Sequence, residues 1–146
     1  MAIVRKPSLE DLGQLVELVH GYRAFYKQDS TDGVEEFVQT RLTTGDSVFF
    51  VAEVDGGLVG FTQCYPGLST VSLSTVWLLN DLFVLPDFRK HGIADALMDE
   101  AEHAAREAGA TRIWLRTAHT NQQAQALYEK RGWVYDETFK RYDLIF

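Results

Sequence analysis

The chain has 146 residues, and 21 Asp and Glu against 14 Lys and Arg give it a formal net charge of −7. Its length suits one domain over residues 1–146, and its composition of 46% hydrophobic and 24% charged residues excludes a disordered, collagen-like or membrane-spanning chain. The acidic balance argues against a nucleic-acid partner and favours a cationic one, while the single cysteine, Cys64, excludes an internal disulfide and predicts a cytoplasmic protein.

Four segments rich in β-branched and aromatic residues predict strands in the first part of the chain: residues 3–5, 48–54, 58–65 and 75–85. Asp55-Gly56-Gly57 tolerates positive φ angles, so it predicts a hairpin between the two middle segments. Apolar residues at helical spacing predict two helices between the first two strands. Ser8 is the predicted N-cap of the first helix, with Asp11 three residues later, and Asp32 is the predicted N-cap of the second.

From Gly92 onward, the hydrophobic period changes from that of a strand to that of a helix. Ile93, Leu97 and Ala101 share one helical face, and Gly109 ends the helix. The rest of the chain predicts a strand, a helix and a β-rich tail, at residues 112–117, 121–131 and 133–146. A helical crossover between strands requires parallel pairing and a hairpin requires antiparallel pairing, so the predicted sheet is mixed.

Residues 80–94 carry the clearest chemical signal, because a strand there runs into a basic, glycine-containing turn that opens a helix. Backbone N–H groups and the positive end of the helix dipole would face an anion at this point. Gly92 allows a phosphate to approach the backbone, and Arg89 and Lys90 add full charges. The pattern predicts a pyrophosphate site, and a basic turn without a ligand is an equally good interpretation. It matches neither the nucleoside triphosphate loop nor the dinucleotide fingerprint.

Arg89-Lys90-His91-Gly92-Ile93-Ala94 resembles the Arg/Gln-x-x-Gly-x-Gly/Ala signature of the GNAT superfamily of acetyl-CoA-dependent N-acetyltransferases. A second segment is similar to that family's other cofactor motif, and its matching residues are Asn121, Ala124, Leu127-Tyr128 and Gly132-Trp133. The resemblance implies an α/β (α+β) fold with a mixed, strongly twisted central sheet of about six or seven strands and about four helices. It also implies acetyl-CoA as the acetyl donor.

The resemblance further implies how acetyl-CoA is bound. The pantetheine arm would add to the strand through main-chain hydrogen bonds at Leu82, Phe83 and Val84, and a bulge would splay this strand from the one at 112–117. Asn121 would bond the same arm, with Ala124 packed against it. The main-chain N–H groups that would hold the pyrophosphate belong to Arg89, Lys90, His91, Gly92, Ile93 and Ala94.

Tyr128 matches the tyrosine that serves the family as general acid and protonates the departing thiolate; a tyrosine that only packs against the cofactor is the alternative. The stretch that begins at Asn80 is similar to the diamine acetyltransferases, which have a glutamate at that position. Because an amide cannot be a base, Asp81 is the predicted base, directly or through water. An aspartate that only bonds loop backbone is an equally good interpretation of Asp81. His119 is a further candidate base, and a loop histidine without a role is the better interpretation of it. The N–H of Val84 would meet the charge that develops on the thioester oxygen.

Other chemistry has little support. Cys64 has no histidine beside it and lies in a hydrophobic strand, so it is predicted to be core rather than a nucleophile. The histidines form no ligand pair, so no metal site is predicted. The resemblance implies that the first two helices wall the acceptor cleft, and an aromatic and acidic cluster lies there. It would either bind a cationic amine or form a solvated helix face: Tyr22, Phe25, Tyr26, Asp29, Asp32, Glu35 and Glu36.

Together these features predict an N-acetyltransferase that moves the acetyl group of acetyl-CoA to a primary amine by direct attack in a ternary complex. The expected acceptor is a small cationic amine, such as a polyamine, a lysine-like amino acid or an aminoglycoside. A protein lysine or N-terminus is the alternative acceptor, and a module that binds acyl-CoA without turnover is the alternative function. The β-rich tail also predicts a homodimer.

Overall fold

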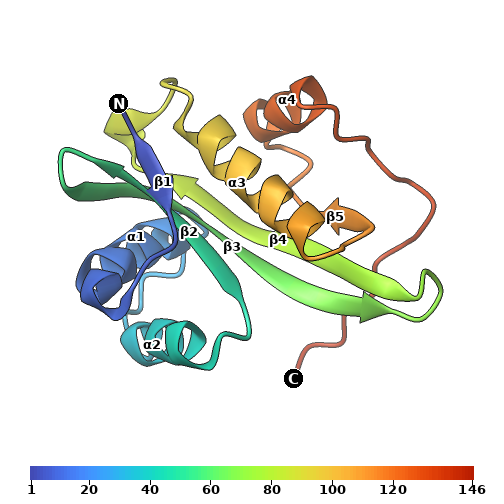
Figure 1. Cartoon of the computed structure of the whole chain (residues 1–146), viewed down its shortest axis with the longest axis horizontal. Coiled ribbons are helices and arrows are strands. Elements are labelled where there is room, and N and C mark those ends of the chain that lie inside the picture. The colour runs from blue at the N-terminus through green and yellow to red at the C-terminus, as the bar shows by residue number, and fades with distance from the viewer. The chain divides into compact units, whose positions relative to one another are not determined.

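The computed structural model describes all 146 residues, which form two compact units, Met1–Leu115 and Arg116–Phe146. The first unit contains a five-stranded sheet in the order β1-β2-β3-β4-β5 (Figure 1). These strands are β1 (Ile3–Arg5), β2 (Val48–Val54), β3 (Gly57–Ser69), β4 (Ser74–Val84) and β5 (Arg112–Trp114). Strands β1 to β4 pair antiparallel and β5 pairs parallel with β4, so the predicted mixed α/β fold is confirmed, with fewer strands than expected.

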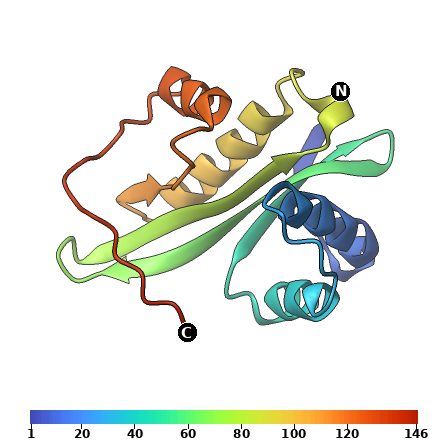
Figure 2. The ribbon, with the colours of Figure 1, turned by 180° about the vertical axis from the view of Figure 1, so that it is seen from behind.

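Three helices cover the two faces of this sheet: α1 (Leu12–Phe25), α2 (Val34–Thr44) and α3 (Ile93–Glu107). Helices α1 and α2 lie on one face and α3 lies on the other (Figures 1 and 2). Strand β2 alternates between the two cores, since Phe49 and Val51 belong to the core under α1 and α2, and Phe50 and Ala52 to the core under α3. Burial of each large apolar side chain stabilises the fold by about 1.5–3 kcal/mol.

The chain enters α1 through the predicted capping box. Ser8 accepts a hydrogen bond from the N–H of Glu10, and the N–H of Ser8 donates to Asp11 at 2.7 Å, with a short 3-10 helix over Leu9–Asp11 before α1 begins. Arg5 donates to the same Asp11 carboxylate at 2.8 Å, which lowers the pKa of that carboxyl. This ion pair connects β1 to the 3-10 helix that precedes α1.

The predicted N-cap of α2 is wrong by one residue. Gly33 occupies the cap position with φ +78°, and no side chain caps the helix. Because only glycine adopts this left-handed conformation without strain, the chain turns into α2 at Gly33, and Asp32 stays outside the helix. The sequence placed the helix correctly and missed the residue that starts it.

Strand β4 carries a bulge at its centre. Gln63 of β3 pairs with Asp81, whereas the next residue, Cys64, pairs with Leu79, so Asn80 is an extra residue on β4. The predicted bulge in this strand is therefore confirmed. In a regular strand neighbouring side chains point to opposite faces, but at a bulge both residues point to the same face. Asn80 and Asp81 consequently both project toward α1.

The second unit contains one helix, α4 (Gln122–Lys130), which begins after Asn121 and follows the predicted boundaries closely. The side-chain oxygen of Asn121 accepts the N–H of Ala124 at 3.2 Å and caps the helix. The prediction of strand structure over 133–146 is wrong, because these residues form no strand and are almost all exposed. Residues that favour β-structure form a strand only where a neighbouring strand pairs with them, and the composition of a segment does not supply that neighbouring strand. No helix of the chain is both long and apolar enough to cross a membrane.

Candidate functional site

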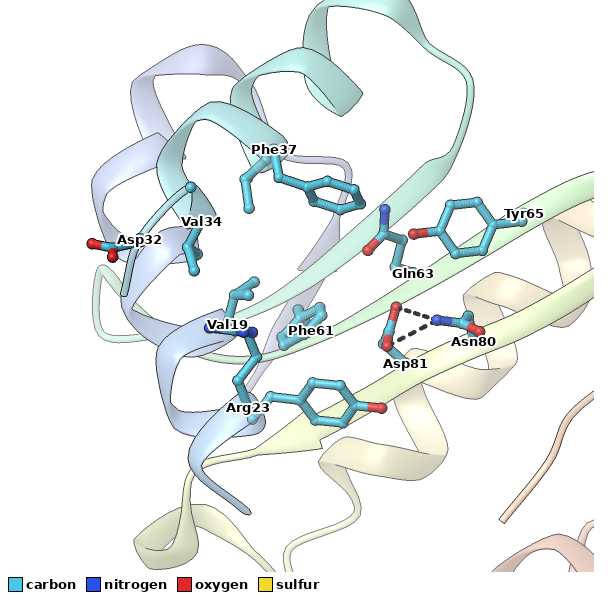
Figure 3. A pocket seen from close by; sticks show the side chains of 13 residues that line it. Val19, Arg23, Asp32, Val34, Phe37, Phe61, Gln63, Tyr65, Asn80 and Asp81 are labelled. Atoms are coloured by element: carbon cyan, nitrogen blue, oxygen red, sulfur yellow. Dashed lines mark hydrogen bonds between the residues drawn. The ribbon is translucent and has the colours of Figure 1, made fainter. Parts of the chain in front are cut away.

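The first unit contains a cavity of about 360 Å³ between helices α1 and α2 and the sheet (Figure 3). Its floor comes from β3, where Phe61, Gln63 and Tyr65 occupy alternate positions and share one face. Apolar side chains of the two helices, including Val34 and Phe37, close the sides. The cavity thus combines apolar walls with a few polar groups, which is typical of small-molecule sites.

Asp81 and Asn80 enter this cavity together because of the bulge. The Nδ2 atom of Asn80 donates to both carboxylate oxygens of Asp81, each at 3.1 Å, and these bonds are drawn in Figure 3. Burial raises the pKa of Asp81, although the hydrogen bonds from Asn80 and from the hydroxyl of Tyr22 lower it in part. The result is a carboxylate inside an apolar cavity that takes up a proton more readily than an ordinary aspartate.

Two tyrosines stand beside this carboxylate. Burial and the nearby charge of Asp81 raise the pKa of Tyr22 and of Tyr65, so both hydroxyls stay protonated at physiological pH. The ring of Tyr22 packs edge-on against Phe61 and Phe83, at 5.7 and 6.0 Å between ring centroids. This packing fixes the ring and holds its hydroxyl at Asp81.

The structure divides the aromatic and acidic cluster that the sequence suggested as an acceptor wall. Only two of its members, Tyr22 and Asp32, line the cavity, and Figure 3 shows the Asp32 carboxylate at the rim, directed away from the interior. The others do not line the cavity and are exposed: Phe25, Tyr26, Asp29, Glu35 and Glu36. Sequence reasoning missed Gln63, Tyr65 and Arg23, although the alternation of residues along β3 could have grouped Gln63 and Tyr65 with Phe61.

Beyond the bulge, the backbone N–H and C=O groups of successive β4 residues point alternately toward β3 and away from it. The N–H of Leu85 donates to the carbonyl of Val59 at 2.8 Å, which makes these two residues a hydrogen-bonded pair. Bonded and non-bonded pairs alternate along antiparallel strands, so the next pair, Gly60 and Val84, is not bonded. The N–H and C=O of Val84 therefore point away from β3. Pairing with β5 ends at Leu78, so no strand occupies that side of β4 at Val84. By the same alternation the polar backbone groups of Leu82 also face outward, whereas those of Phe83 face β3.

The turn after β4 has the conformation that an anion site needs. Lys90 and Gly92 have φ angles of +64° and +78°, and no side chain caps α3. The N–H of Ala96 makes the first bond of the helix, to the carbonyl of Gly92 at 3.0 Å, so the amides of Ile93 and Ala94 have no acceptor within it. Arg89 turns back and donates to the carbonyl of Val84 at 2.8 Å. The residues present therefore fit a bound pyrophosphate.

Gly92→Ala is expected to weaken CoA binding about fivefold. A Cβ at Gly92 meets no atom within 4 Å, so the substitution is harmful only through the left-handed φ of +78°, which costs an alanine about 1 kcal/mol. The turn would relax away from the geometry that presents its N–H groups. Titration calorimetry with CoA measures the loss, and Gly13→Ala on α1, where a Cβ also meets nothing, is the matched control. Unchanged CoA affinity in Gly92→Ala would contradict a role for this turn.

The other residues that the sequence singled out lie in the second unit. Tyr128 is half-buried on α4, with its ring 6.1 Å from that of Trp133. His119 is exposed, and its carbonyl accepts a hydrogen bond from the Gln125 side chain at 3.0 Å. Nothing in the geometry of His119 distinguishes it as a base.

Cys64 is fully buried, and burial raises the pKa of its thiol to about 12. As the neighbour of Gln63 on β3, it points to the opposite face of the sheet from the cavity. A protonated thiol outside the cavity is no nucleophile, which agrees with the interpretation of Cys64 as core. No group of three or more His, Cys, Asp or Glu side chains is placed to hold a metal ion.

Comparison with known proteins agrees with this geometry. A sequence model of the Acetyltransferase (GNAT) family matches residues 15–133. The chain is 39% identical over 142 residues to an uncharacterized N-acetyltransferase of Bacillus subtilis (strain 168), YhfO, with 97% of this chain and 95% of that protein covered. A crystal structure of a probable acetyltransferase has a TM-score of 0.92 and 36% identity, over 99% of this chain and 97% of that one. The aminoglycoside acetyltransferase AAC(6')-Iy, solved with the bisubstrate analogue CoA-S-monomethyl-acetylneamine, shares the fold at 21% identity and a TM-score of 0.86, over 99% of both chains.

Proposed function

Because the chain belongs to the GNAT family and is an acetyl-CoA-dependent N-acetyltransferase, we propose that its acceptor is a small cationic primary amine bound in the cavity between α1, α2 and the sheet. The observation that carries this proposal is the Asp81 carboxylate, which projects into that cavity and has a raised pKa. An ammonium group pairs with a carboxylate in such a site and can give it a proton. The volume of about 360 Å³ lies at the small end of ligand cavities and suits a compact amine or one arm of a larger one.

Asp81 acts as the general base in this proposal. An amine is mostly protonated at neutral pH, so it must lose a proton before its lone pair can attack. The carboxylate of Asp81 takes that proton, and its raised pKa makes it a better acceptor than an ordinary aspartate. Asn80 holds the carboxylate in one orientation through the two 3.1 Å hydrogen bonds, so Asn80 is a positioning residue.

Acetyl-CoA supplies the acetyl group as a thioester, from which the thiol departs when the amine nitrogen bonds to the carbonyl carbon. The N–H of Val84, directed away from β3, stabilises the negative charge that develops on the carbonyl oxygen. Tyr128 donates its phenolic proton to the departing sulfur, as the family resemblance implies. A phenol can do this, because its pKa of about 10 is close to the value of about 8.5 for a thiol.

Backbone groups supply most of the proposed cofactor site. The outward N–H and C=O of Leu82 bind the pantetheine arm, whereas the N–H of Val84 serves the thioester oxygen and its carbonyl accepts Arg89 at 2.8 Å. The backbone groups of Phe83 face β3, so Phe83 makes no main-chain bond to the arm. At the start of α4, Asn121 bonds the pantetheine arm and Ala124 packs against it, as the resemblance implies. The main-chain N–H groups of Lys90, His91, Gly92, Ile93 and Ala94 bind the pyrophosphate. The N–H of Arg89 donates to the carbonyl of Pro86 at 3.3 Å, so Arg89 contributes its positive charge to the turn and not its main-chain N–H.

Thiol release from acetyl-CoA across an amine panel tests the proposal. The panel contains polyamines, lysine and its analogues, aminoglycosides and lysine-containing peptides, and CoA binding is measured beside it by calorimetry. We expect release with at least one class of small amine and none with the peptides. Release with peptides alone would move the acceptor to a protein lysine. CoA binding without release from any amine would favour a non-catalytic module. The homodimer and the cytoplasmic location stay predictions.

A further inference from the structure

Gln63 is a buried glutamine in the floor of the cavity, with only 4% of its surface exposed. It pairs across the sheet with Asp81, directly beside the bulge. Figure 3 shows the amide of Gln63, the carboxylate of Asp81 and the hydroxyl of Tyr65 converging at one end of the cavity. Burial of an amide is unfavourable unless its polar atoms are bonded, so this side chain is held in a defined orientation.

Ser47 fixes that orientation. The Nε2 atom of Gln63 donates to the hydroxyl of Ser47 at 3.0 Å, and Ser47 itself is only 8% exposed. With its NH₂ group directed to Ser47, the amide presents its carbonyl oxygen on the cavity side, as Figure 3 shows. A carbonyl oxygen accepts hydrogen bonds and cannot take a proton at neutral pH. Gln63 and Asp81 therefore offer two acceptors of different kinds to one nitrogen.

We propose that Gln63 is a positioning residue for the acceptor nitrogen and makes the site selective for primary over secondary amines. The inference rests on the proposed function. A primary ammonium gives one proton to Asp81, and the neutral amine keeps two N–H bonds. One of these donates to the Gln63 oxygen while the lone pair attacks the acetyl carbon. The other proton leaves the nitrogen as the C–N bond forms and the C–S bond breaks, and it replaces the phenolic proton that Tyr128 gives to the departing sulfur. The N–H held by Gln63 is therefore the one that the amide product keeps.

A neutral secondary amine has a single N–H bond, and none remains in the amide product. The ammonium form must lose both of its N–H protons on the way to the product, and the extra alkyl group takes the place of the hydrogen that Gln63 would hold. The carbonyl oxygen then faces a carbon and lacks a donor. Discrimination against N-methyl amines follows from the chemistry of this one oxygen, without any change in the volume of the cavity.

The test compares a primary amine that the enzyme acetylates with its N-methyl derivative, in the wild type and in Gln63→Leu. A hydrogen bond of this kind corresponds to about a 10- to 100-fold difference in kcat/KM. We expect the wild type to favour the primary amine by that factor. Gln63→Leu should lose it with the primary amine, mainly in kcat, and change little with the N-methyl amine, so the preference falls to about threefold or less. CoA affinity should stay at the wild-type value.

Two further variants separate positioning from folding. Ser47→Ala leaves Gln63 in place and frees its amide to rotate, so we expect a partial loss of the preference. Tyr65→Phe removes a neighbouring hydroxyl and should keep the ratio between the two amines. Equal losses with both amines in Gln63→Leu, or an unchanged preference in Gln63→Leu and Ser47→Ala, would overturn the inference while the wild type stays active. A wild type that acetylates no primary amine would overturn the proposed function and this inference with it.

Discussion

Asp81→Asn is expected to lower kcat/KM for the acceptor amine by about 10²- to 10⁴-fold, the usual contribution of a general base. The amide keeps the size of the side chain and its place in the cavity but cannot accept the ammonium proton. CoA affinity should not change, because Asp81 lies in the cavity between α1 and the sheet and not at the turn that precedes α3. Steady-state kinetics beside CoA calorimetry measure the two quantities separately.

The pH dependence of kcat/KM gives a second test of Asp81 as the base. Burial raises the pKa of Asp81, so the acid limb of the kcat/KM profile should lie above the ordinary aspartate value of about 3.9. Removing the donor in Asn80→Ala takes away a contact that lowers this pKa, so the limb should move further upward. Loss of activity in Asp81→Asn with an unchanged acid limb would assign the proton transfer to another group.

Asp81→Asn should raise the stability of the fold near neutral pH, although it lowers the activity. The folded chain binds the Asp81 proton more tightly than the unfolded chain does, because its pKa is raised. The stability from this group is therefore present below the unfolded pKa of about 3.9 and is lost as the pH rises through the folded pKa. Asp81→Asn removes the buried charge, so it should raise the melting temperature near neutral pH and leave it unchanged in acid. A lower melting temperature at neutral pH would mean that the carboxylate stabilises the fold.

Tyr128→Phe is expected to lower kcat by about 10²- to 10⁴-fold with CoA affinity unchanged. The substitution keeps the ring that packs near Trp133 and removes only the hydroxyl that would protonate the departing thiolate. The matched control is Tyr135→Phe in the same unit, whose side chain is 70% exposed and which should behave as the wild type. Parallel losses of turnover and CoA affinity would indicate a packing role, and full turnover would exclude Tyr128 as the acid.

The local structure around the proposed cofactor site could be predicted from the sequence, and little of the acceptor cavity could. The turn at Gly92 and the helix that begins near Asn121 could be predicted because each depends on neighbouring residues with a defined local geometry, whereas the bulge in β4 was expected from the family resemblance. The cavity depends on which residues three separate elements bring together, and a single glutamine such as Gln63 has no local signature. The role proposed for Gln63 depends on its register opposite Asp81.

Two predictions made from the sequence are wrong for the same physical reason. The tail at 133–146 has the composition of a strand, but pairing decides whether a strand forms, and pairing is not a local property. Asp32 has the chemistry of an N-cap, yet the left-handed Gly33 determined where α2 begins. In both cases a correct local preference was overridden by the path of the chain.

The single extra residue in β4 lets the face that lines the cavity vary independently of the rest of the sheet. Without Asn80, the positions on either side would still alternate as they do now, with Leu79 opposite Cys64 and Asp81 opposite Gln63. Asn80 is thus an insertion that adds a second polar group to one face and leaves the other face unaltered. A related enzyme can exchange the residue here, amide for carboxylate, and acquire a different acceptor without repacking its core.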